Sequence, residues 1–380
     1  MPANRYDAIV IGLGGMGSAV AFHLARRGKR VLGLEQYGLL HDRGASHGLT
    51  RIIRLAYHEH PSYVSLLRRS YELWHELESL AGERLLITTG CIEGGPEDGR
   101  TFRGALEAAR MHDLPHEVLD VAELRRRYPA YGALDPTTRA LFQPDGGFLL
   151  AERTLLAHVN QAIAHGAELH FHEPVASWDA ALNGSVKVAT PRATYQADRL
   201  VICAGPWAGR VVPRLASLAV PERQVLAWLQ PTRPELFTPD RFPVFVLEVP
   251  DGSYYGFPVY DVPGFKFGRY HHLREPIDPD DPDRSTRADD EAILRAFAIR
   301  HFPEGAGPTI MLKACLFTNS PDEHFVIDLL PDAPQVSVAA GFSGHGYKFC
   351  SLVGEVMADL AINGATSHHI GLFKLDRFTA

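Results

Sequence analysis

Three glycines near the start of the chain have the spacing of a pyrophosphate-binding turn. Gly12, Gly14 and Gly17 fit the pattern G-x-G-x-x-G within DAIVIGLGGMGSAVAFHLARRGKRVLGLE, residues 7–35. Glycines here let the backbone approach a pyrophosphate, and the amino end of the following helix favours its negative charge. Glu35 ends the next apolar run, where a carboxylate can accept from a ribose hydroxyl and favours FAD or NAD over NADP. The segment predicts a dinucleotide cofactor, with a ligand-free glycine turn as the plainer alternative.

The residues around these glycines predict the β-α-β unit that must hold them. Residues 8–11 are apolar and predict a buried parallel strand, and residues 18–27 predict a helix that Gly28 ends. Residues 30–34 predict the second strand, which leads into Glu35. Because strand, glycine turn, helix, strand and acid follow in the order that a dinucleotide site needs, the motif is stronger than its glycines alone.

Later segments predict a return to the same sheet and a second sheet of another kind. Residues 197–208 and 336–349 each contain an apolar strand followed by glycine, and residues 350–362 predict a helix. Residues 244–272 alternate with period two between Gly and Pro turns, which is typical of antiparallel strands. The sequence therefore predicts an α/β protein with a discontinuous Rossmann-like domain and a second α+β domain built on an antiparallel sheet.

This prediction divides the chain into two interleaved domains. The predicted dinucleotide-binding domain comprises residues 1–83, 148–220 and 319–380, and the predicted substrate-binding domain comprises residues 84–147 and 221–318.

Composition excludes several classes of function. The net charge of −7 carries no basic stripe, so nucleic acid is not expected as a partner. The 4 cysteines form no C-x-x-C pair and the 19 histidines form no H-E-x-x-H motif, so neither a disulfide framework nor a metal site is expected. The chain starts without a basic leader and lacks an apolar run of roughly 18 residues. We therefore expect a soluble, cytoplasmic protein without a membrane segment.

A second glycine-rich loop near the carboxyl end resembles a hydrolase nucleophile elbow at first sight. In GFSGHG around Ser343, however, the pattern G-x-S-x-G requires glycine where His345 stands, which excludes that interpretation. Gly341, Gly344 and Gly346 instead predict a loop whose backbone comes close to a flat ligand, before a helix whose amino end favours negative charge.

One cysteine has neighbours that could make it reactive. Cys315 lies in KACLFTNSPDEHFVID, residues 313–328, two positions after Lys313. A free cysteine is often a small buried hydrophobic residue, whereas a neighbouring cation such as Lys313 would favour the reactive thiolate. The residues alone leave both interpretations open.

Five segments share their order and spacing with a known group of enzymes. They are SHGLTRIIRLAY (46–57), YGFP (255–258), FKFG (265–268), CLFTNSPDEHFVID (315–328) and AAGFSGHGYKF (339–349). With them the chain resembles, over nearly its full length, the monomeric sarcosine oxidase and N-methyltryptophan oxidase family of FAD-dependent amine oxidases. The resemblance implies FAD as the cofactor, in a Rossmann-like domain.

The resemblance also implies where the chain holds the flavin. Cys315 matches the cysteine that forms a thioether with the flavin 8-methyl group, with noncovalent FAD and a buried thiol as the alternative. Arg51 matches an arginine against the flavin, and His345 a histidine close to it. Lys266 matches the lysine at the oxygen-reaction site, where a fixed cation stabilises superoxide, although a solvated strand lysine is the alternative.

The same resemblance implies a substrate site for an amino acid. Arg54 and Lys348 match the two cations that hold the substrate carboxylate, a role that suits the planar fork of arginine. Tyr255 matches an active-site tyrosine. The family often continues K-x-G-x-H after its lysine, whereas Tyr270 stands here where the histidine is expected and His271 follows it.

The predicted function is an FAD-dependent oxidase of secondary amino acids such as sarcosine. The resemblance implies that the substrate becomes an imine, which hydrolyses to an aldehyde and an amine, while O2 becomes hydrogen peroxide. It also implies a monomer with a small amino acid and O2 as its partners. Two alternatives stay open: a sibling oxidase of N-methyltryptophan, pipecolate or fructosyl amino acids, and a flavin-binding redox module without turnover. Lys266, Arg54 and Lys348 count against the second.

Overall fold

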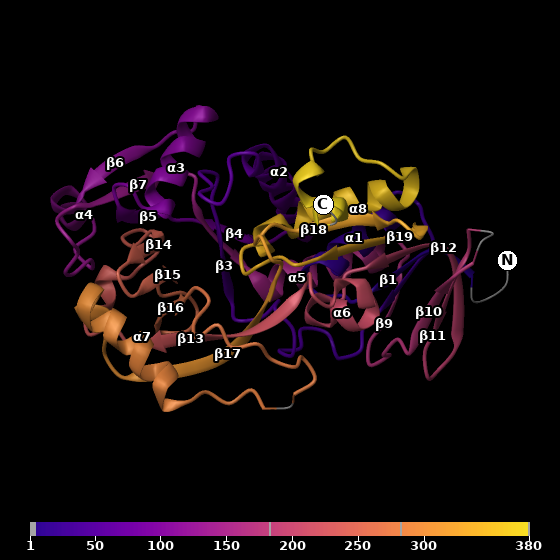
Figure 1. The fold of residues 1–380 in the computed structure, drawn as a ribbon. Coiled ribbons are helices and arrows are strands. Elements are labelled where there is room, and N and C mark those ends of the chain that lie inside the picture. The colour runs from indigo at the N-terminus through magenta and orange to yellow at the C-terminus, as the bar shows by residue number, and fades with distance from the viewer. Residues whose placement is uncertain (1–4, 182–183, 282, 379–380) are drawn as a thin grey trace.

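The computed structural model describes residues 5–181, 184–281 and 283–378. Within these residues the strands form two eight-stranded sheets and one three-stranded sheet. Figure 1 shows the chain as two lobes, one of which holds both chain ends. None of the described helices is both long and apolar enough to cross a membrane.

The first sheet forms the core of the lobe that holds the chain ends. Its path runs β10-β11-β12-β1-β2-β9, with β19 also on β12 and β18 on β19. β1, β2, β9, β12 and β19 pair in parallel, while β10, β11 and β18 join antiparallel. The strands are β1 (Arg5–Ile11), β2 (Val31–Leu34), β9 (Glu168–His170), β10 (Ser177–Ala180), β11 (Val186–Ala189), β12 (Thr194–Ile202), β18 (Val326–Leu330) and β19 (Ala333–Ala340).

Alternating side chains of β1 face two different cores. Ala8 and Val10 pack into a core with the helices, and Ile9 and Ile11 pack into the core on the opposite face of the sheet. A strand buried on both faces has to be apolar at every position, which explains the continuous apolar run in the sequence.

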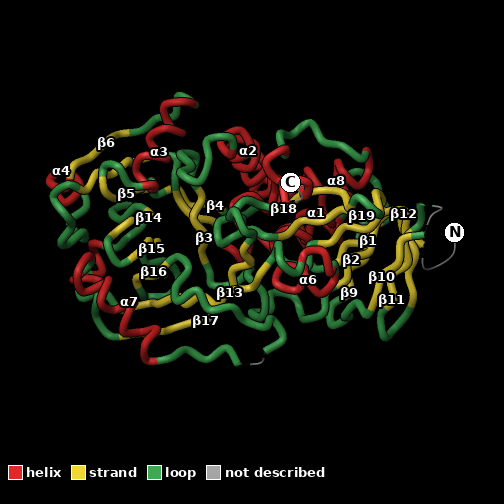
Figure 2. Tube along the Cα trace, in the orientation of Figure 1, coloured by secondary structure: helices red, strands yellow, loops and turns green. Residues whose placement is uncertain are grey.

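Helices cover the first sheet and carry the glycine turn to the cavity. Figure 2 shows α1, α2 and α8 gathered beside this sheet, and α1 also packs against α5. The predicted helix at residues 18–27 begins earlier, at Gly15, because Gly14 is its amino-terminal cap. The helices of this lobe are α1 (Gly15–Arg26), α2 (Tyr63–Ala81), α5 (Ala151–Ala164), α6 (Ala208–Val211) and α8 (Cys350–Asn363).

The second sheet forms the other lobe, in the order β17-β13-β16-β15-β14-β5-β7-β6. Its pairs are antiparallel except for β14 with β5. The strands are β5 (Cys91–Pro96), β6 (Glu117–Asp120), β7 (Thr138–Gln143), β13 (Val220–Leu229), β14 (Val244–Val249), β15 (Gly252–Phe257), β16 (Phe265–Arg269) and β17 (Thr309–Asn319). The helices are α3 (Arg100–Met111), α4 (Val121–Arg127) and α7 (Ala288–His301).

A small third sheet places the predicted arginines. It consists of β3 (Thr50–Ile53), β8 (Gly147–Leu150) and β4 (Leu86–Thr88), with β8 in the middle. Arg51 lies in β3, and Arg54 directly follows this strand. Short 3-10 turns complete the chain at 205–207, 213–215, 234–236, 303–305, 347–349, 371–373 and 375–378.

The predicted α/β architecture with a second, mainly antiparallel sheet is confirmed. The strands predicted at residues 8–11 and 30–34 are β1 and β2, and the alternating residues 244–272 contain β14, β15 and β16. The limits of the two predicted domains stay a prediction.

Candidate functional site

A cavity of about 1080 Å³ is lined by residues of both lobes, and most of the predicted site residues are among them. Ligand cavities commonly measure roughly 300 to 1,000 Å³, so this one suits a large ligand. Of the predicted residues, the cavity is lined by Gly12, Gly14, Glu35, Arg51, Arg54, Tyr255, Tyr270, Cys315, Gly344, His345, Gly346 and Lys348. Gly17 and Lys266 lie behind its wall.

Each of the three positions in the first turn requires glycine for a different physical reason. Gly12 has φ +85°, and a Cβ there would lie 2.5 Å from the carbonyl oxygen of Cys203. A Cβ on Gly17 would lie 1.8 Å from the carbonyl oxygen of Gly12, so these two glycines are required by the turn itself. A Cβ on Gly14 would meet only Ser46 Oγ, at 3.3 Å, and Gly14 lines the cavity. Gly14 therefore keeps the backbone open to a ligand, which fits a pyrophosphate.

Glu35 is held at the end of β2 with its carboxylate in the cavity wall. Its Oε2 accepts from the Leu13 backbone nitrogen at 2.9 Å, and its Oε1 accepts from that of Tyr37 at 3.0 Å. These bonds fix the carboxylate beside the glycine turn, where its further lone pairs can accept from a ribose hydroxyl. The glycine turn and the Glu35 carboxylate at this end of the cavity therefore fit a dinucleotide.

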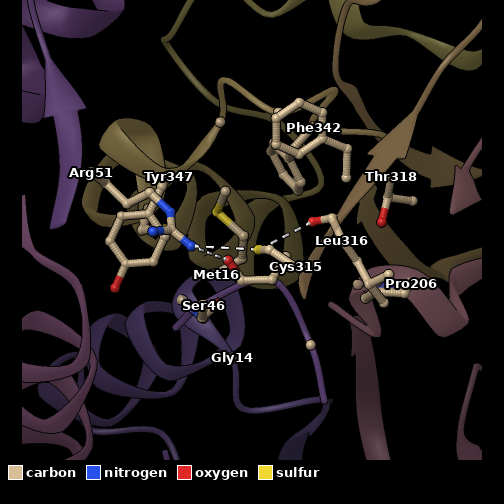
Figure 3. Close-up of a pocket in the computed structure, with 18 of the residues that line it drawn as sticks. Gly14, Met16, Ser46, Arg51, Pro206, Cys315, Leu316, Thr318, Phe342 and Tyr347 are labelled. Carbon is tan, nitrogen blue, oxygen red and sulfur yellow. Dashed lines mark hydrogen bonds between the residues drawn. The ribbon is translucent and has the colours of Figure 1, made fainter. Parts of the chain in front are cut away.

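Cys315 lies on β17 with its side chain against Arg51, as Figure 3 shows. Arg51 Nη2 is 3.8 Å from Cys315 Sγ. Lys313 is instead 3.5 Å from Asp42 and forms an ion pair with it. The expectation that Lys313 activates the thiol therefore needs correction: the cation in contact with the sulfur is Arg51, because Asp42 holds Lys313.

Arg51 itself is fixed by the backbone around it. Its guanidinium donates to the carbonyl oxygens of Thr50 at 2.9 Å and Ala45 at 3.0 Å, and also to that of His47. A guanidinium held by three carbonyl groups keeps its position, which suits a residue that must face both the thiol and a flat ligand.

Arg54 is buried and its guanidinium is shared between two carboxylates. Nη2 donates to both oxygens of Glu59 at 2.8 Å, and Nη1 donates to the Ala56 carbonyl oxygen at 3.0 Å. Nη1 is also 3.2 Å from Oε1 of Glu93. Burial acts to lower the pKa of Arg54, but Glu59 and Glu93 outweigh it and raise that pKa, so the group is a permanent cation.

Lys348 supplies the second cation beside Arg54. Its Nζ donates to the His345 carbonyl oxygen at 2.7 Å and to Tyr57 Oη at 3.4 Å. Burial, followed by the charge of Arg54, lowers its pKa to about 7, whereas Glu59 acts to raise it. The ammonium therefore loses its proton as the pH rises through about 7 in the substrate-free protein.

His345 contacts Lys348 directly and through Tyr57, and its ring has a defined tautomer. Burial lowers its pKa to about 4, so the imidazole is neutral at neutral pH. Its Nε2 is 2.8 Å from the Glu323 carbonyl oxygen, which only accepts, so Nε2 carries the proton. Nδ1 then accepts from Tyr57 Oη at 2.6 Å. The chain of contacts from His345 through Tyr57 to Lys348 is continuous.

Tyr270 and His271 have clearly different surroundings. Tyr270 lines the cavity, and its hydroxyl donates to the Ser343 carbonyl oxygen at 2.5 Å. His271 lies outside this cavity and bridges Glu222 at 2.9 Å and Glu323 at 3.0 Å. Tyr270 therefore occupies the cavity wall where the resemblance leads one to expect a histidine, and His271 does not replace it.

Tyr255 reaches the cavity from β15 because its cross-strand neighbour is a glycine. A Cβ on Gly268 would lie 2.8 Å from Tyr255 Oη. The hydroxyl therefore extends over the strand toward the cavity without a clash.

Lys266 lies one layer behind the cavity wall. Its Nζ donates to the carbonyl oxygens of Gly48 at 2.6 Å and Thr50 at 2.7 Å, and to Thr50 Oγ1 at 2.9 Å. It also lies 4.2 Å from the ring centroid of Phe257, which lines the cavity. Burial, and to a smaller extent Arg51, lowers the pKa of Lys266 well below its usual value, while the three acceptors match the three donors of an ammonium.

The glycine loop before α8 packs against aromatic rings. Gly344 has φ +75°, and a Cβ there would lie 2.3 Å from the Phe317 ring; one on Gly346 would lie 2.5 Å from Phe342. Both glycines line the cavity, but their lack of a side chain is required by packing against the protein itself.

Sequence reasoning did not single out four residues that surround Arg54 and Lys348, the two cations called the carboxylate clamp below. Tyr57 ends the segment SHGLTRIIRLAY and follows Arg54 closely enough to have been a candidate. Glu93 interrupts the apolar strand β5 and is fully buried, and a single acid in such a strand is a usable sign of a buried partner. His58 and Glu59 carry no such sign, because their positions follow from the irregular turn after β3.

The chain matches a known protein family over most of its length. The family described as "FAD dependent oxidoreductase" matches residues 7–360. Monomeric sarcosine oxidase of Streptomyces avermitilis is 43% identical over 99% of this chain and 98% of that protein. N-methyl-L-tryptophan oxidase of Yersinia pestis is 36% identical over 98% of this chain and 99% of that protein. The chain therefore belongs to the FAD-dependent oxidoreductases, in the group of the monomeric sarcosine and N-methyltryptophan oxidases, which confirms the resemblance found in the sequence.

Solved structures agree with this fold. NikD, an unusual amino acid oxidase essential for nikkomycin biosynthesis, superimposes with a TM-score of 0.84 at 26% identity over 98% of both chains. Glycine oxidase from Geobacillus kaustophilus gives a TM-score of 0.80 over 99% of both chains, at 21% identity, which bears on the fold alone.

The contact between Cys315 and Arg51 leads to a prediction about flavin attachment. If Cys315 forms the thioether that the resemblance implies, we expect the purified holoprotein to keep its yellow colour in the acid precipitate and to carry one FAD mass, because Cys315 Sγ lies in the cavity wall beside Arg51. Cys315→Ala should release all flavin into the supernatant, whereas Cys203→Ala is the matched control with another buried thiol in the cavity wall. Complete release from the unaltered protein, or retention in Cys315→Ala, would contradict the assignment.

Proposed function

We propose that this protein oxidises secondary amino acids, with sarcosine or another N-methyl amino acid as the substrate. The observation that carries the proposal is the pair of buried cations, Arg54 and Lys348, which both line the cavity that the glycine turn opens. Two cations in a desolvated wall favour an anionic ligand and discriminate against simple amines. The names of the most similar relatives support the same substrate class.

The cavity residues fit FAD, which would supply the redox chemistry by accepting an electron pair from the substrate and passing it to O2. Gly12, Gly14 and Glu35 would hold the dinucleotide end. Arg51 and Cys315 would hold the opposite end, with a thioether from Cys315 as the proposed linkage. The protein contributes orientation and fixed charge, and the cofactor contributes the chemistry.

The clamp orients the substrate through its carboxylate. In the structure Arg54 Nη2 donates to both carboxylate oxygens of Glu59, so a substrate carboxylate competes with Glu59 for this edge of the guanidinium. Lys348 approaches from the side of Tyr57 and His345. With its carboxylate held at two points, the substrate has a fixed orientation in the cavity, which Tyr255 and Tyr270 also line.

The remaining roles are assigned from position and charge. Lys266 supplies a fixed cation for the reduction of O2, held one layer behind Phe257 and Thr50. The four cysteines are free and buried, which supports a reducing compartment such as the cytoplasm. The relatives named monomeric support a monomer.

A sibling substrate is the second candidate. The similarity to N-methyl-L-tryptophan oxidase supports an amino acid with a larger side chain. The residues that line the cavity from the second lobe, Val246 and Ser253 among them, would decide the size of side chain that fits.

The carboxylate clamp predicts a large effect of Arg54. Removing one charge-assisted partner in a desolvated site costs about 2 to 4 kcal/mol, so Arg54→Ala should raise the KM for sarcosine roughly 30- to 1000-fold. Arg54→Lys should recover only part, because a point charge does not reproduce the fork. Steady-state peroxide production with sarcosine measures both.

Dimethylamine, which has no carboxylate, is the control substrate for this test. It should be a poor substrate of the unaltered enzyme and should change little in Arg54→Ala. If the enzyme oxidises dimethylamine as well as sarcosine, or if Arg54→Ala leaves sarcosine kinetics unchanged, the substrate class is wrong.

The buried ammonium of Lys266 predicts a separation of the two half-reactions. Lys266→Met keeps the length of the side chain and removes the charge, so reoxidation of the reduced enzyme by O2 should slow by orders of magnitude. Anaerobic reduction by sarcosine should change much less. Stopped-flow absorbance measures each step, and equal losses in both would show that Lys266 positions the site instead.

A further inference from the structure

Arg54 has a second acidic partner on the side of the guanidinium that faces away from the cavity. Glu93 lies on β5 of the second lobe with a side chain that is 0% exposed, and its Oε1 is 3.2 Å from Arg54 Nη1. Glu93 is not part of the cavity wall, whereas Arg54 and Glu59 both are. A carboxylate so deeply buried is rare unless it is paired.

The two terminal nitrogens of the guanidinium differ in their surroundings: Nη1 contacts protein groups away from the cavity, and Nη2 faces the cavity. Nη1 donates to the Ala56 carbonyl oxygen and forms an ion pair with Glu93. Among the residues that the structure describes, Nη2 donates only to Glu59, which lines the cavity. Nη1 is therefore committed to the protein, and Nη2 is the end that a ligand can reach.

The second lobe holds the segment around Arg54 from two neighbouring strands. Gln143 on β7 accepts from the backbone nitrogens of Leu55 at 2.9 Å and Ala56 at 3.2 Å through its Oε1. Glu93 on β5 accepts from His58 Nδ1 at 2.8 Å. The turn that carries Arg54 is thus fixed at its backbone by Gln143 and at its side chains by Glu93.

Only one oxygen of Glu93 makes these contacts. Oε1 serves both Arg54 Nη1 and His58 Nδ1, while Oε2 is buried without a hydrogen-bond partner among the described residues. An unpaired buried carboxylate oxygen is costly, so its presence beside the clamp calls for a role in positioning. The same arrangement offers an experiment, because a glutamine can keep Oε1 and replace only Oε2.

We propose that Glu93 is a positioning residue that, together with His58, orients Arg54 so that Nη2 faces the substrate carboxylate. Glu93 acts through Arg54 and does not touch the substrate. The assignment rests on the proposed function, because it needs the clamp to bind a carboxylate. Without Glu93, the guanidinium keeps one acceptor on Nη1, and Glu59 becomes its only carboxylate partner, which makes Glu59 harder to displace.

Two variants of Glu93 separate the effect of losing its polar contacts from the effect of changing the side-chain volume. Glu93→Leu removes both acceptor contacts at similar volume, and Glu93→Gln retains the Oε1 contacts to Arg54 and His58. We expect Glu93→Leu to weaken the binding of propionate to the oxidised holoenzyme roughly 10- to 100-fold. Binding is measured at about pH 6 as a change in the visible absorbance spectrum of the flavin. At this pH, below the pKa of about 7 of Lys348, the second cation of the clamp stays charged.

Glu93→Gln should bind propionate close to the unaltered protein. In turnover, Glu93→Leu should raise the KM for sarcosine by a similar factor while the limiting rate of anaerobic flavin reduction changes less than about threefold, because only binding of the carboxylate is affected.

Asp290→Asn is the matched control. Asp290 is also 0% exposed and binds an arginine, Arg223, through both oxygens at 2.9 and 2.6 Å, but neither residue lines the cavity. This variant should lower the melting temperature and leave propionate binding unchanged.

The outcomes distinguish failure of this inference from failure of the proposed function. Failure of the unaltered holoenzyme to bind either propionate or sarcosine contradicts the proposed function and the inference with it. Normal binding in the unaltered protein and equal binding in Glu93→Leu overturns the positioning role alone. An equal loss in Glu93→Gln and Glu93→Leu also overturns it, because charge rather than orientation through Oε1 would then be responsible. If Glu93→Leu does not fold, the same titration of Glu93→Asp, which shortens the reach to Arg54, should show an intermediate loss, and normal binding there would refute the role.

Discussion

The buried charge of Arg54 is the constraint on which the arrangement of the two lobes depends. A guanidinium that is 3% exposed needs partners, and leaving such a charge uncompensated costs on the order of 3 to 5 kcal/mol. Its partners come from the turn after β3, through Ala56 and Glu59, and from the second sheet, through Glu93. The pairing thus ties the strand that carries both arginines to the sheet of the other lobe. It also leaves one end of the cation at the cavity, which is the property a carboxylate site needs.

The cofactor end of the cavity depends on a different constraint, the close approach of backbone atoms. Gly12 and Gly17 bring β1, α1 and the end of β12 together at distances that no side chain tolerates, and Gly14 is left facing the cavity. Glu35 is fixed at the same edge by two backbone nitrogens. Parallel strands bring all their carboxyl ends to one edge of the sheet, so the glycine turn and the acid meet although the helix α1 separates them in sequence.

Much of this could be predicted from local sequence. Each strand and turn of the first β-α-β unit follows from a short apolar run bounded by glycine, and the second sheet follows from period-two alternation in residues 244–272. The roles of Arg54, Lys348 and Cys315 came from the family resemblance instead, since an arginine or cysteine in a single sequence does not reveal what it faces.

The rest depended on contacts between distant segments, which local patterns do not encode. Lys313 is close to Cys315 in sequence, yet Asp42 holds it and Arg51 reaches the sulfur instead. Glu93 lies on the second sheet and Arg54 in the turn after β3, and their pairing follows from the packing of the two lobes. Tyr270 and His271 are adjacent, and only the path of the chain after β16 decides which of them enters the cavity.

Anaerobic mixing of the purified holoenzyme with sarcosine tests the central claim most directly, because it asks whether a bound amino acid gives its electrons to the flavin without any contribution from O2. The account predicts that the visible flavin absorbance bleaches fully and returns when air is admitted, with peroxide formed in equal amount. A flavin spectrum that stays oxidised with sarcosine and with larger N-methyl amino acids would contradict the account, and would leave a flavin-binding protein whose buried cations serve another purpose.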